Sequence, residues 1–195
     1  HILAEKESGR SQGLPSLVIA PTSVVMNWQR EIVKFTESLE VLVLQGQRRH
    51  EQFGKMAKAD VVLSSYALIH RDLERFSSQS FHMVVLDEAQ YIKNPQAQVS
   101  VAVKQLRSNH RLCLSGTPVE NHLGELWSLM SFLMPELLGP QESFNETYRN
   151  PIEKSQNRSA KESLQARVGP LVMRRTKQEV AKELPPKTEI VHTVK

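Results

Sequence analysis

The sequence predicts an α/β fold, in which a parallel sheet carries helices on both faces and is followed by a helical appendage. Three observations support this prediction. Short apolar runs recur along the chain, helical patterns lie between them, and the alternation stops after Pro135. Unbroken apolar runs separated by helices are typical of strands that are buried on both faces, as in a parallel sheet.

The apolar runs give the expected strands, and the spacing between them gives two helices. The runs are Leu17–Ala20, Val41–Leu44, Val61–Leu63, Met83–Leu86 and Arg111–Leu114. The apolar residues that share a helix face are Val24, Val25, Trp28, Ile32 and Phe35 in the first helix, and Leu123, Leu126, Trp127, Met130 and Leu133 in the second. Core packing is the expected role of Trp28 and Trp127, because large apolar residues are usually buried.

Past Pro135 the chain holds polar helical segments that are interrupted by glycine and proline. The expected organisation is a sheet domain over residues 1–134, a helical protrusion over 135–187, and the start of a strand or linker over 188–195, which is rich in β-branched residues. The opening HILAEKESGR reads as the end of a helix stopped by Gly9, so the chain is expected to be cut from a longer protein.

Composition limits the possible classes of protein. The chain has 195 residues, of which 39% are hydrophobic and 24% charged, and this excludes a disordered protein. A net charge of +4 permits an acidic partner such as nucleic acid. The single cysteine, Cys113, excludes a disulfide framework and is expected in the core. No apolar run approaches the ~20 residues of a membrane span, so a cytoplasmic or nuclear location without a membrane partner is expected.

Polar residues follow the expected strands, at the edge where ligands bind in open parallel sheets. They are Pro21, Thr22 and Ser23; Ser64, Ser65 and Tyr66; Asp87 and Glu88; and Ser115, Gly116, Thr117 and Pro118. The adjacent acids suit nucleotide hydrolysis, because one carboxylate can hold magnesium through water while its neighbour orients the attacking water. The alternative for Asp87 and Glu88 is capping of the next segment or a surface ion pair.

Other chemistries find no support. The phosphate-binding pattern G-x-x-x-x-G-K-[ST] is absent, since Gly54 and Lys55 are flanked by Arg49 and Met56 at the positions that need glycine and a hydroxyl. The histidines show no metal-ligand spacing with one another or with Cys113, so no zinc site is expected. A G-x-S-x-G nucleophile elbow is also absent.

Five blocks of the sequence together resemble one family. They are LVIAPTSVVMNWQREI (17–32), DVVLSSYALI (60–69), LDEAQYIKN (86–94), LSGTPVENHLGELWSLMSFLMPELLG (114–139) and VMRRTKQEVAKELPPK (172–187). In this order they are similar to the Swi/Snf (sucrose non-fermenting) family of DNA translocases, within helicase superfamily two. The resemblance covers nearly the whole chain.

The resemblance implies a RecA-like parallel sheet of the P-loop NTPase type, together with the helical protrusion that the family inserts after its first lobe. It implies that the phosphate-binding loop lies upstream of His1 and that a second RecA-like lobe, with arginine fingers, follows Lys195. The isolated chain is therefore expected to be inactive, since loss of an arginine finger alone costs roughly 10³ to 10⁵ in rate.

The resemblance also assigns roles around the acid pair. Asp87 is expected to hold Mg²⁺ through water, and Glu88 to polarise the attacking water in ATP hydrolysis. Gln90 is expected to couple nucleotide state to the neighbouring strand end, although a solvated turn residue is the alternative. Ser115, Gly116 and Thr117 match the motif that links hydrolysis to DNA movement, with an N-cap role as the alternative for Thr117.

The remaining roles concern DNA. The residues expected to contact its phosphate backbone are Pro21, Thr22, Ser23, Ser64 and Ser65. Short hydroxyls and free N–H groups suit phosphates and carry no sequence information. Arg174, Arg175 and Thr176 match a block that leads to the second lobe, and the alternative is that both arginines brace the protrusion by ion pairs.

The leading hypothesis is a part of an ATP-dependent translocase that is stimulated by double-stranded DNA, with a DNA-bound protein as a possible further partner. A second hypothesis is a non-catalytic interaction module that kept the fold and lost the ATP site. The acid pair argues against it, since a decayed site has no reason to keep both acids. A strand-separating helicase of a neighbouring branch is a third hypothesis, which the WxxE at Trp28 and the ENHLGELWSL block disfavour by resemblance.

Overall fold

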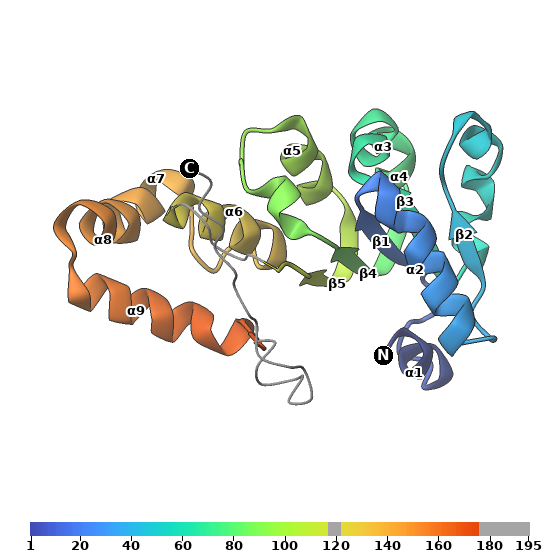
Figure 1. Cartoon of the computed structure of the whole chain (residues 1–195), viewed down its shortest axis with the longest axis horizontal. Helices are drawn as coiled ribbons and strands as arrows, with labels where there is room; N and C mark the ends of the chain where they lie inside the picture. Colours follow the sequence, from blue (N-terminus) through green and yellow to red (C-terminus); the bar gives the residue numbers. More distant parts are fainter. Residues whose placement is uncertain (117–121, 176–195) are drawn as a thin grey trace, which may run out of the picture.

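The structure is a computed structural model that describes residues 1–116 and 122–175. Its centre is a five-stranded sheet with the order β2-β3-β1-β4-β5, in which every paired strand is parallel to its neighbour (Figure 1). The strands are β1 (Ser16–Ala20), β2 (Val41–Val43), β3 (Val61–Ser65), β4 (Ser80–Leu86) and β5 (Arg107–Cys113). The predicted fold class is confirmed. Thr117, Thr176 and the expected strand at 188–195 lie outside the described residues.

Helices and single turns connect and follow the strands. The α-helices are α1 (Ile2–Glu7), α2 (Thr22–Phe35), α3 (Tyr66–Arg71), α4 (Leu73–Ser77), α5 (Gln98–Lys104), α6 (Leu123–Leu133), α7 (Gln141–Phe144), α8 (Asn150–Ser155) and α9 (Arg158–Val168). The other turns are the 3₁₀ segments η1 (Gln47–Glu51), η2 (Phe53–Lys58), η3 (Ala89–Ile92) and η5 (Gly169–Leu171), and the π turn η4 (Asn145–Arg149).

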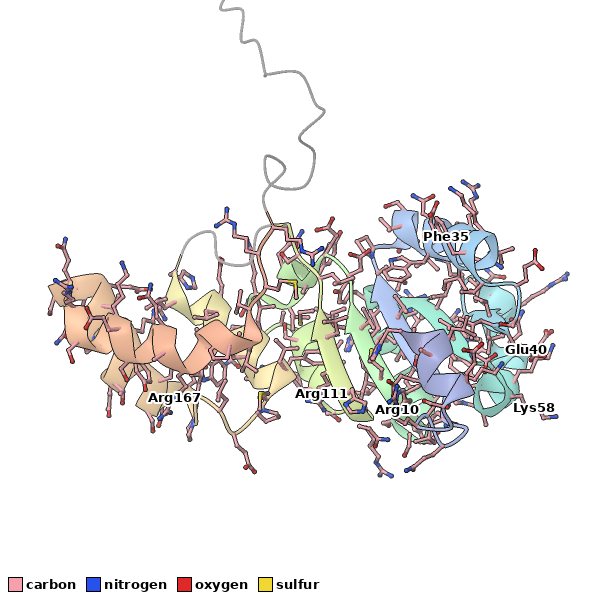
Figure 2. The ribbon with its side chains drawn as sticks, turned by 90° about the horizontal axis from the view of Figure 1, so that it is seen from below. Arg10, Phe35, Glu40, Lys58, Arg111 and Arg167 are labelled. Atoms are coloured by element: carbon pink, nitrogen blue, oxygen red, sulfur yellow. The ribbon has the colours of Figure 1, made fainter. Side chains whose placement is uncertain are left out.

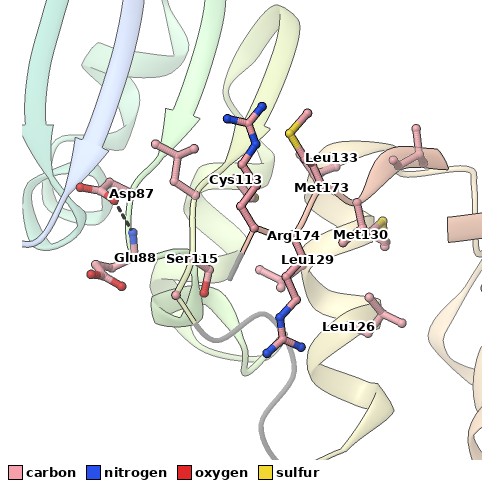
Figure 3. Close-up of a pocket in the computed structure, with 15 residues that line it drawn as sticks. Asp87, Glu88, Cys113, Ser115, Leu126, Leu129, Met130, Leu133, Met173 and Arg174 are labelled. Carbon is pink, nitrogen blue, oxygen red and sulfur yellow. Dashed lines mark hydrogen bonds between the residues drawn. The ribbon is translucent and has the colours of Figure 1, made fainter. Parts of the chain in front are cut away.

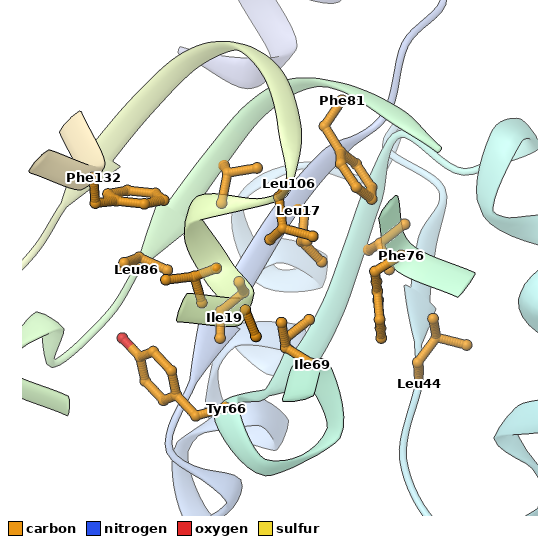
Figure 4. Packing of buried hydrophobic residues seen from close by; sticks show 14 of the residues in the cluster. Leu17, Ile19, Leu44, Tyr66, Ile69, Phe76, Phe81, Leu86, Leu106 and Phe132 are labelled. Carbon is orange, nitrogen blue, oxygen red and sulfur yellow. The ribbon is translucent and has the colours of Figure 1, made fainter. Parts of the chain in front are cut away.

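The sheet is covered on both faces because successive side chains of each strand point to opposite sides. On one face, Leu17 and Ile19 of β1 pack with residues of α3, α4, α5 and α6, including Phe76 and Phe132 (Figure 4). On the other face, Val18 packs with residues of α1 and α2. Burial on both faces explains why the strands read as unbroken apolar runs.

The connections bring the polar strand ends to one edge. The chain runs from β1 through α2 to β2 on one face, and from β3 through α3 and α4 to β4 on the other. These two crossovers pass in opposite directions over opposite faces, so both have the same hand, as the right-handed rule requires. Because all strands are parallel, the residues after β1, β3, β4 and β5 meet at one edge of the sheet.

Helix α6 joins the sheet to the helices that follow it. Its residues Leu129 and Phe132 belong to the core against the sheet, whereas Met130 belongs to a third cluster with Phe144 and Leu164 of α7 and α9. Figure 1 shows α7, α8 and α9 gathered to one side of the sheet, beyond α6. No helix among the described residues has the length and apolar character needed to cross a membrane.

Two details differ from the prediction. Phe35 was expected on the buried face of α2, and this is wrong, because its side chain is 72% exposed (Figure 2). A 14-residue helix is about 21 Å long and outreaches a five-residue strand, so its last turn overhangs the sheet. The last strand begins at Arg107 rather than Arg111. It is an edge strand of the described sheet. Its first residues are polar and largely face solvent, so they do not form an apolar run.

Candidate functional site

The acid pair lies in a short loop directly after β4. Glu88 has left-handed backbone angles (φ 50°, ψ 55°), which cost a non-glycine residue about 1 kcal/mol or more. Backbone bonds hold the loop: the Asp87 N–H donates to the Ile19 carbonyl at 2.8 Å, and the Ala89 N–H donates to the Leu114 carbonyl at 2.9 Å. The acids are therefore presented by a conformation that the surrounding strands impose.

Each carboxylate is oriented by hydrogen bonds from named donors. One oxygen of Asp87, Oδ1, accepts the Glu88 N–H at 2.9 Å, and the other, Oδ2, accepts the Trp28 indole N–H at 2.8 Å. Glu88 accepts a bond of 2.7 Å from the side-chain amide of Gln90. The Ser115 hydroxyl donates to the amide oxygen of Gln90 at 3.0 Å. A continuous chain of contacts thus links Glu88, through Gln90, to the end of β5.

A cleft of about 750 Å³ opens beside the acid pair (Figure 3). Asp87, Glu88 and Ser115 line one side, and apolar residues of α6 such as Leu129 and Met130 line the other. Arg174 and Arg175 also line the cleft, and neither forms an ion pair with another described residue. The cleft therefore offers acids, an apolar wall and two cations to a single ligand.

The donor set fits a magnesium ion that is shared with a nucleotide. Within the described ranges, no group of three or more His, Cys, Asp or Glu side chains could hold a metal ion by itself. Each Asp87 oxygen accepts one bond and keeps a lone pair that can accept from metal-bound water. Mg²⁺ binds hard oxygens and typically uses one or two carboxylates together with water and substrate phosphates. Asp87 and Glu88 can provide the carboxylates.

A second hollow of about 370 Å³ lies at the ends of β1, β2 and β3. Its lining includes Thr22, Gly46, Ser65 and Arg71. The Ser65 residue is only 2% exposed, and no described residue hydrogen-bonds its hydroxyl, whereas Arg71 is exposed. The hollow begins at the first residue of the 14-residue α2, where the helix dipole favours an anion. These features suit a phosphate group.

The expected DNA contacts are thus separated by the structure. Thr22 and Ser23 are exposed at the start of α2. Ser64 is fully buried, and its hydroxyl donates to the Leu44 carbonyl at 3.2 Å, so its side chain supports the sheet and does not face the hollow. Pro21 precedes α2 and adopts an extended conformation (ψ 144°). Of the two adjacent serines, Ser65 is the one that lines the hollow.

Two aromatic residues donate hydrogen bonds to Asp87, a role that their positions in the sequence did not predict. The Tyr66 hydroxyl donates to the Asp87 carbonyl at 2.7 Å, and its ring stacks on Tyr91 with a centroid distance of 4.9 Å. Burial, and after it the nearby negative charges, raises the pKa of Tyr66, so its hydroxyl stays protonated. Trp28 was expected only in the core, and nothing in its spacing indicated the bond to Asp87. Arg71 and the loop at Gly46 were also missed, although a glycine before two arginines after the second strand was a usable signal.

Cys113 behaves as expected for a packed residue. It is half-buried against the larger core, and burial raises the pKa of its thiol to about 12. A thiol with so high a pKa is protonated at neutral pH and is a poor nucleophile. No catalytic role is assigned to it.

Two curated proteins are similar to this chain in sequence. The chain is 45% identical over 194 residues to the Bacillus subtilis protein YwqA, which is named for ATP-dependent helicase or translocase activity, and the match covers 97% of this chain but 21% of that protein. It is 37% identical over 193 residues to the TATA-binding protein-associated factor MOT1 of Saccharomyces cerevisiae, with coverage of 92% and 10%. The chain therefore spans about a fifth or less of the length of these relatives.

Two solved structures are similar to this chain in both fold and sequence. The Sulfolobus solfataricus SWI2/SNF2 ATPase core in complex with double-stranded DNA superposes with a TM-score of 0.83 at 40% identity, over 92% of this chain and 37% of that one. A second structure, of the S. solfataricus SWI2/SNF2 ATPase core domain, superposes with a TM-score of 0.80 at 40% identity. That match covers 94% of this chain and 37% of the other. The family described as the SNF2-related domain matches residues 1–195. Because that match covers the whole chain, the protein belongs to the SNF2-related family.

Proposed function

We propose that the protein is an ATP-dependent translocase on double-stranded DNA, and that the acid pair belongs to its ATP-hydrolysing site. The observation that carries this proposal is the fixed acid loop at the same sheet edge as the hollow at Ser65. Two carboxylates oriented by Trp28 and Gln90 provide for magnesium and water, and the hollow provides for a phosphate of the DNA backbone.

In the proposed ATP site, each residue has a separate task. Glu88 orients the water that attacks the terminal phosphate, and its partner Gln90 holds the carboxylate in place. Asp87 accepts hydrogen bonds from metal-bound water. Mg²⁺, when bound, neutralises charge on the phosphates. Ser115 and Gly116, together with Thr117, which lies outside the described residues, link ATP hydrolysis to DNA movement. The bond between Ser115 and Gln90 connects them to Glu88.

In the proposed DNA site, backbone phosphate binds the start of α2 and the Ser65 hydroxyl, beside Arg71. Such contacts position the protein on the duplex without reading its sequence, as a translocase requires. Pro21, Thr22 and Ser23 present backbone and hydroxyl groups at the same place. The S. solfataricus core named with double-stranded DNA supports this assignment by likeness.

Other parts of the proposal concern the longer protein. The relatives extend well past the matched region, and we assign the phosphate-binding loop and a second RecA-like lobe with arginine fingers to those extensions. Residues 1–134 would form the first lobe and 135–187 its helical protrusion. A DNA-bound protein is the proposed object of the motion, and the protein would work where the DNA is, in a nucleoid or a nucleus.

The test is ATP hydrolysis by the full-length protein, with and without duplex DNA. Glu88→Gln should reduce the DNA-stimulated rate by at least about 100-fold, because it removes the group that orients the water. Its fold should persist, since Gln can occupy the same space. Glu162→Gln is the matched control, because Glu162 is 59% exposed on α9 and, among the described residues, pairs with Arg158 of the same helix. Equal rates for wild type and Glu88→Gln would refute the assignment.

One alternative is a non-catalytic module of the same fold. It predicts no ATP hydrolysis by the wild-type protein with or without DNA, whereas the proposal predicts hydrolysis that DNA stimulates. The fixed orientation of both carboxylates favours the enzyme, because a module would have no use for it.

A further inference from the structure

Two hydrogen bonds reach Asp87 from α2 and α3, which are two of the elements that border the hollow at Ser65. One comes from the Trp28 indole of α2, whose first residue, Thr22, lines the hollow. The other comes from the Tyr66 hydroxyl of α3, which begins immediately after Ser65. The first bond ends on the Asp87 side chain and the second on its backbone carbonyl. Two elements that face the proposed DNA phosphate, α2 and α3, therefore also hold Asp87, the residue proposed for magnesium.

Neither bond is needed for packing alone. Trp28 packs against the cluster of Val18 and Val85, and a phenylalanine ring, although smaller, would keep much of that apolar contact without an N–H. Tyr66 is 4% exposed and belongs to the larger core, where a phenylalanine would also fit. The polar atom of each ring is instead directed at one residue in the acid loop, 59 and 21 positions away along the chain.

The elements between the two sites are stiff enough to transmit a displacement. Thr22 and Trp28 lie six positions apart in one continuous α-helix, about 9 Å along its axis. Ser65 and Tyr66 are adjacent, and the Tyr66 ring stacks on Tyr91, which follows the acid pair in η3. Asp87 also accepts the Glu88 N–H, so a change at Asp87 acts on the left-handed conformation of Glu88.

We propose that Trp28 and Tyr66 are positioning residues that couple the phosphate hollow to the acid pair, so that DNA bound at one site changes nucleotide affinity at the other. This inference rests on the proposed function. Neither residue is assigned a contact with ATP or DNA. Their effect is on the position of Asp87, and through it on Glu88.

The coupling has a direct measure. Linkage requires that Mg²⁺ with a non-hydrolysable ATP analogue changes DNA affinity by the same factor by which DNA changes affinity for the analogue. In the full-length protein, this factor is the ratio of the DNA dissociation constants measured without and with the analogue. Loss of one hydrogen bond typically changes an equilibrium about fivefold. Trp28→Phe and Tyr66→Phe should each move the ratio toward one by about that factor, while DNA affinity without nucleotide stays near the wild-type value.

Matched controls are available in the helical region. Trp127→Phe removes an indole N–H that donates to the Gly139 carbonyl at 3.1 Å, and Tyr148→Phe removes the hydroxyl of another buried tyrosine. Both residues lie in or against the third cluster, away from the acid loop. They should leave the ratio unchanged, although they cost stability of their own, which thermal unfolding of all four variants will measure.

The outcomes separate the two levels of proposal. A wild-type protein that neither hydrolyses ATP nor binds duplex DNA would refute the proposed function and this inference with it. If the wild type does both, the inference alone fails in three cases: the wild-type ratio is one, Trp28→Phe and Tyr66→Phe both keep the wild-type ratio, or the controls change it equally.

Discussion

At the scale of single residues, Glu153 shows how the helical region is fixed to α6, the helix that packs against the sheet. Helix α6 begins after His122, which makes no side-chain cap, and the exposed N–H of Leu123 donates instead to Glu153 of α8 at 2.7 Å. Arg149 donates to the other carboxylate oxygen at 3.1 Å. Burial raises the pKa of Glu153, but these hydrogen bonds outweigh it and leave the pKa below its ordinary value.

Glu153→Gln should therefore destabilise the protein at neutral pH by about 0.5 to 1 kcal/mol, the usual worth of a helix-terminal cap at a solvent-screened site. A lowered pKa in the folded state means that the carboxylate stabilises the fold above its unfolded-state pKa, near 4.3. That contribution disappears as pH falls through the lower, folded-state pKa. Urea unfolding at pH 7 and at pH 3 checks this, and a difference between wild type and variant that is the same at both pH values would contradict it.

The sequence predicted much of the site at this scale, and the reason is positional. Residues that directly follow a strand are placed by the strand, so the apolar runs alone assign Asp87, Glu88 and Ser115 to one edge of the sheet. Partners that arrive from elsewhere could not be assigned in this way. The bond from Trp28 to Asp87 depends on how α2 lies across the sheet. Which of the two adjacent serines lines the hollow depends on the face of the sheet that each side chain takes.

At the scale of elements, the loop between β2 and η1 is held by a buried ion pair. Arg49 and Asp72 each expose 7% of their side chains and form two hydrogen bonds, of 2.6 and 3.2 Å. A third bond of 2.7 Å runs from Arg49 to the carbonyl of Gly46, whose positive φ of 68° suits glycine. The pair thus fixes the loop that borders the hollow at Ser65.

Asp72→Asn should lower the free energy of unfolding by about 2 to 3 kcal/mol, because it leaves the guanidinium buried without its counter-charge. Replacing both partners, as Arg49→Met with Asp72→Leu, should cost less than Asp72→Asn alone, since no buried charge remains. Chemical denaturation of the single and double variants decides the matter. A double variant less stable than the single one would show that the loop depends on packing rather than on charge.

The sequence predicted the boundaries of some helices and strands better than those of others. The central strands were found because burial on both faces makes them mostly apolar. The edge strand β5 and the overhanging end of α2 were misjudged, since exposure at both places breaks the link between apolar pattern and burial. The end of α1 was predicted from Gly9, and the structure agrees, with the helix closing at Glu7 and Gly9 at a φ of 72°.

At the scale of the whole molecule, the net charge of +4 is too small to name a DNA surface by itself. Salt dependence can locate it. If Arg71 neutralises one phosphate, Arg71→Gln should reduce the slope of log affinity against log salt by about 0.9, and Ser65→Ala should weaken binding without changing the slope. Duplex binding by the full-length protein at several salt concentrations gives both values.

Arg158→Gln is the matched control for this measurement. Arg158 is 90% exposed on α9, so the change removes the same charge from a site away from the hollow. The slope should then match the wild type. If Arg71→Gln and Arg158→Gln shift the slope equally, the hollow at Ser65 has no special role in binding phosphate.

Helix α6 also has a practical consequence for anyone who divides the protein. It packs against the sheet through Leu129 and Phe132, and against the helical region through Met130. Its Ser128 hydroxyl donates to the carbonyl of Ile92, the last residue of η3, at 2.6 Å. A cut after residue 134 would expose the apolar face of α6 in the N-terminal product. The C-terminal product would lose the helix against which its apolar cluster packs. Both would be prone to aggregate, so the two parts are better expressed and studied as one piece.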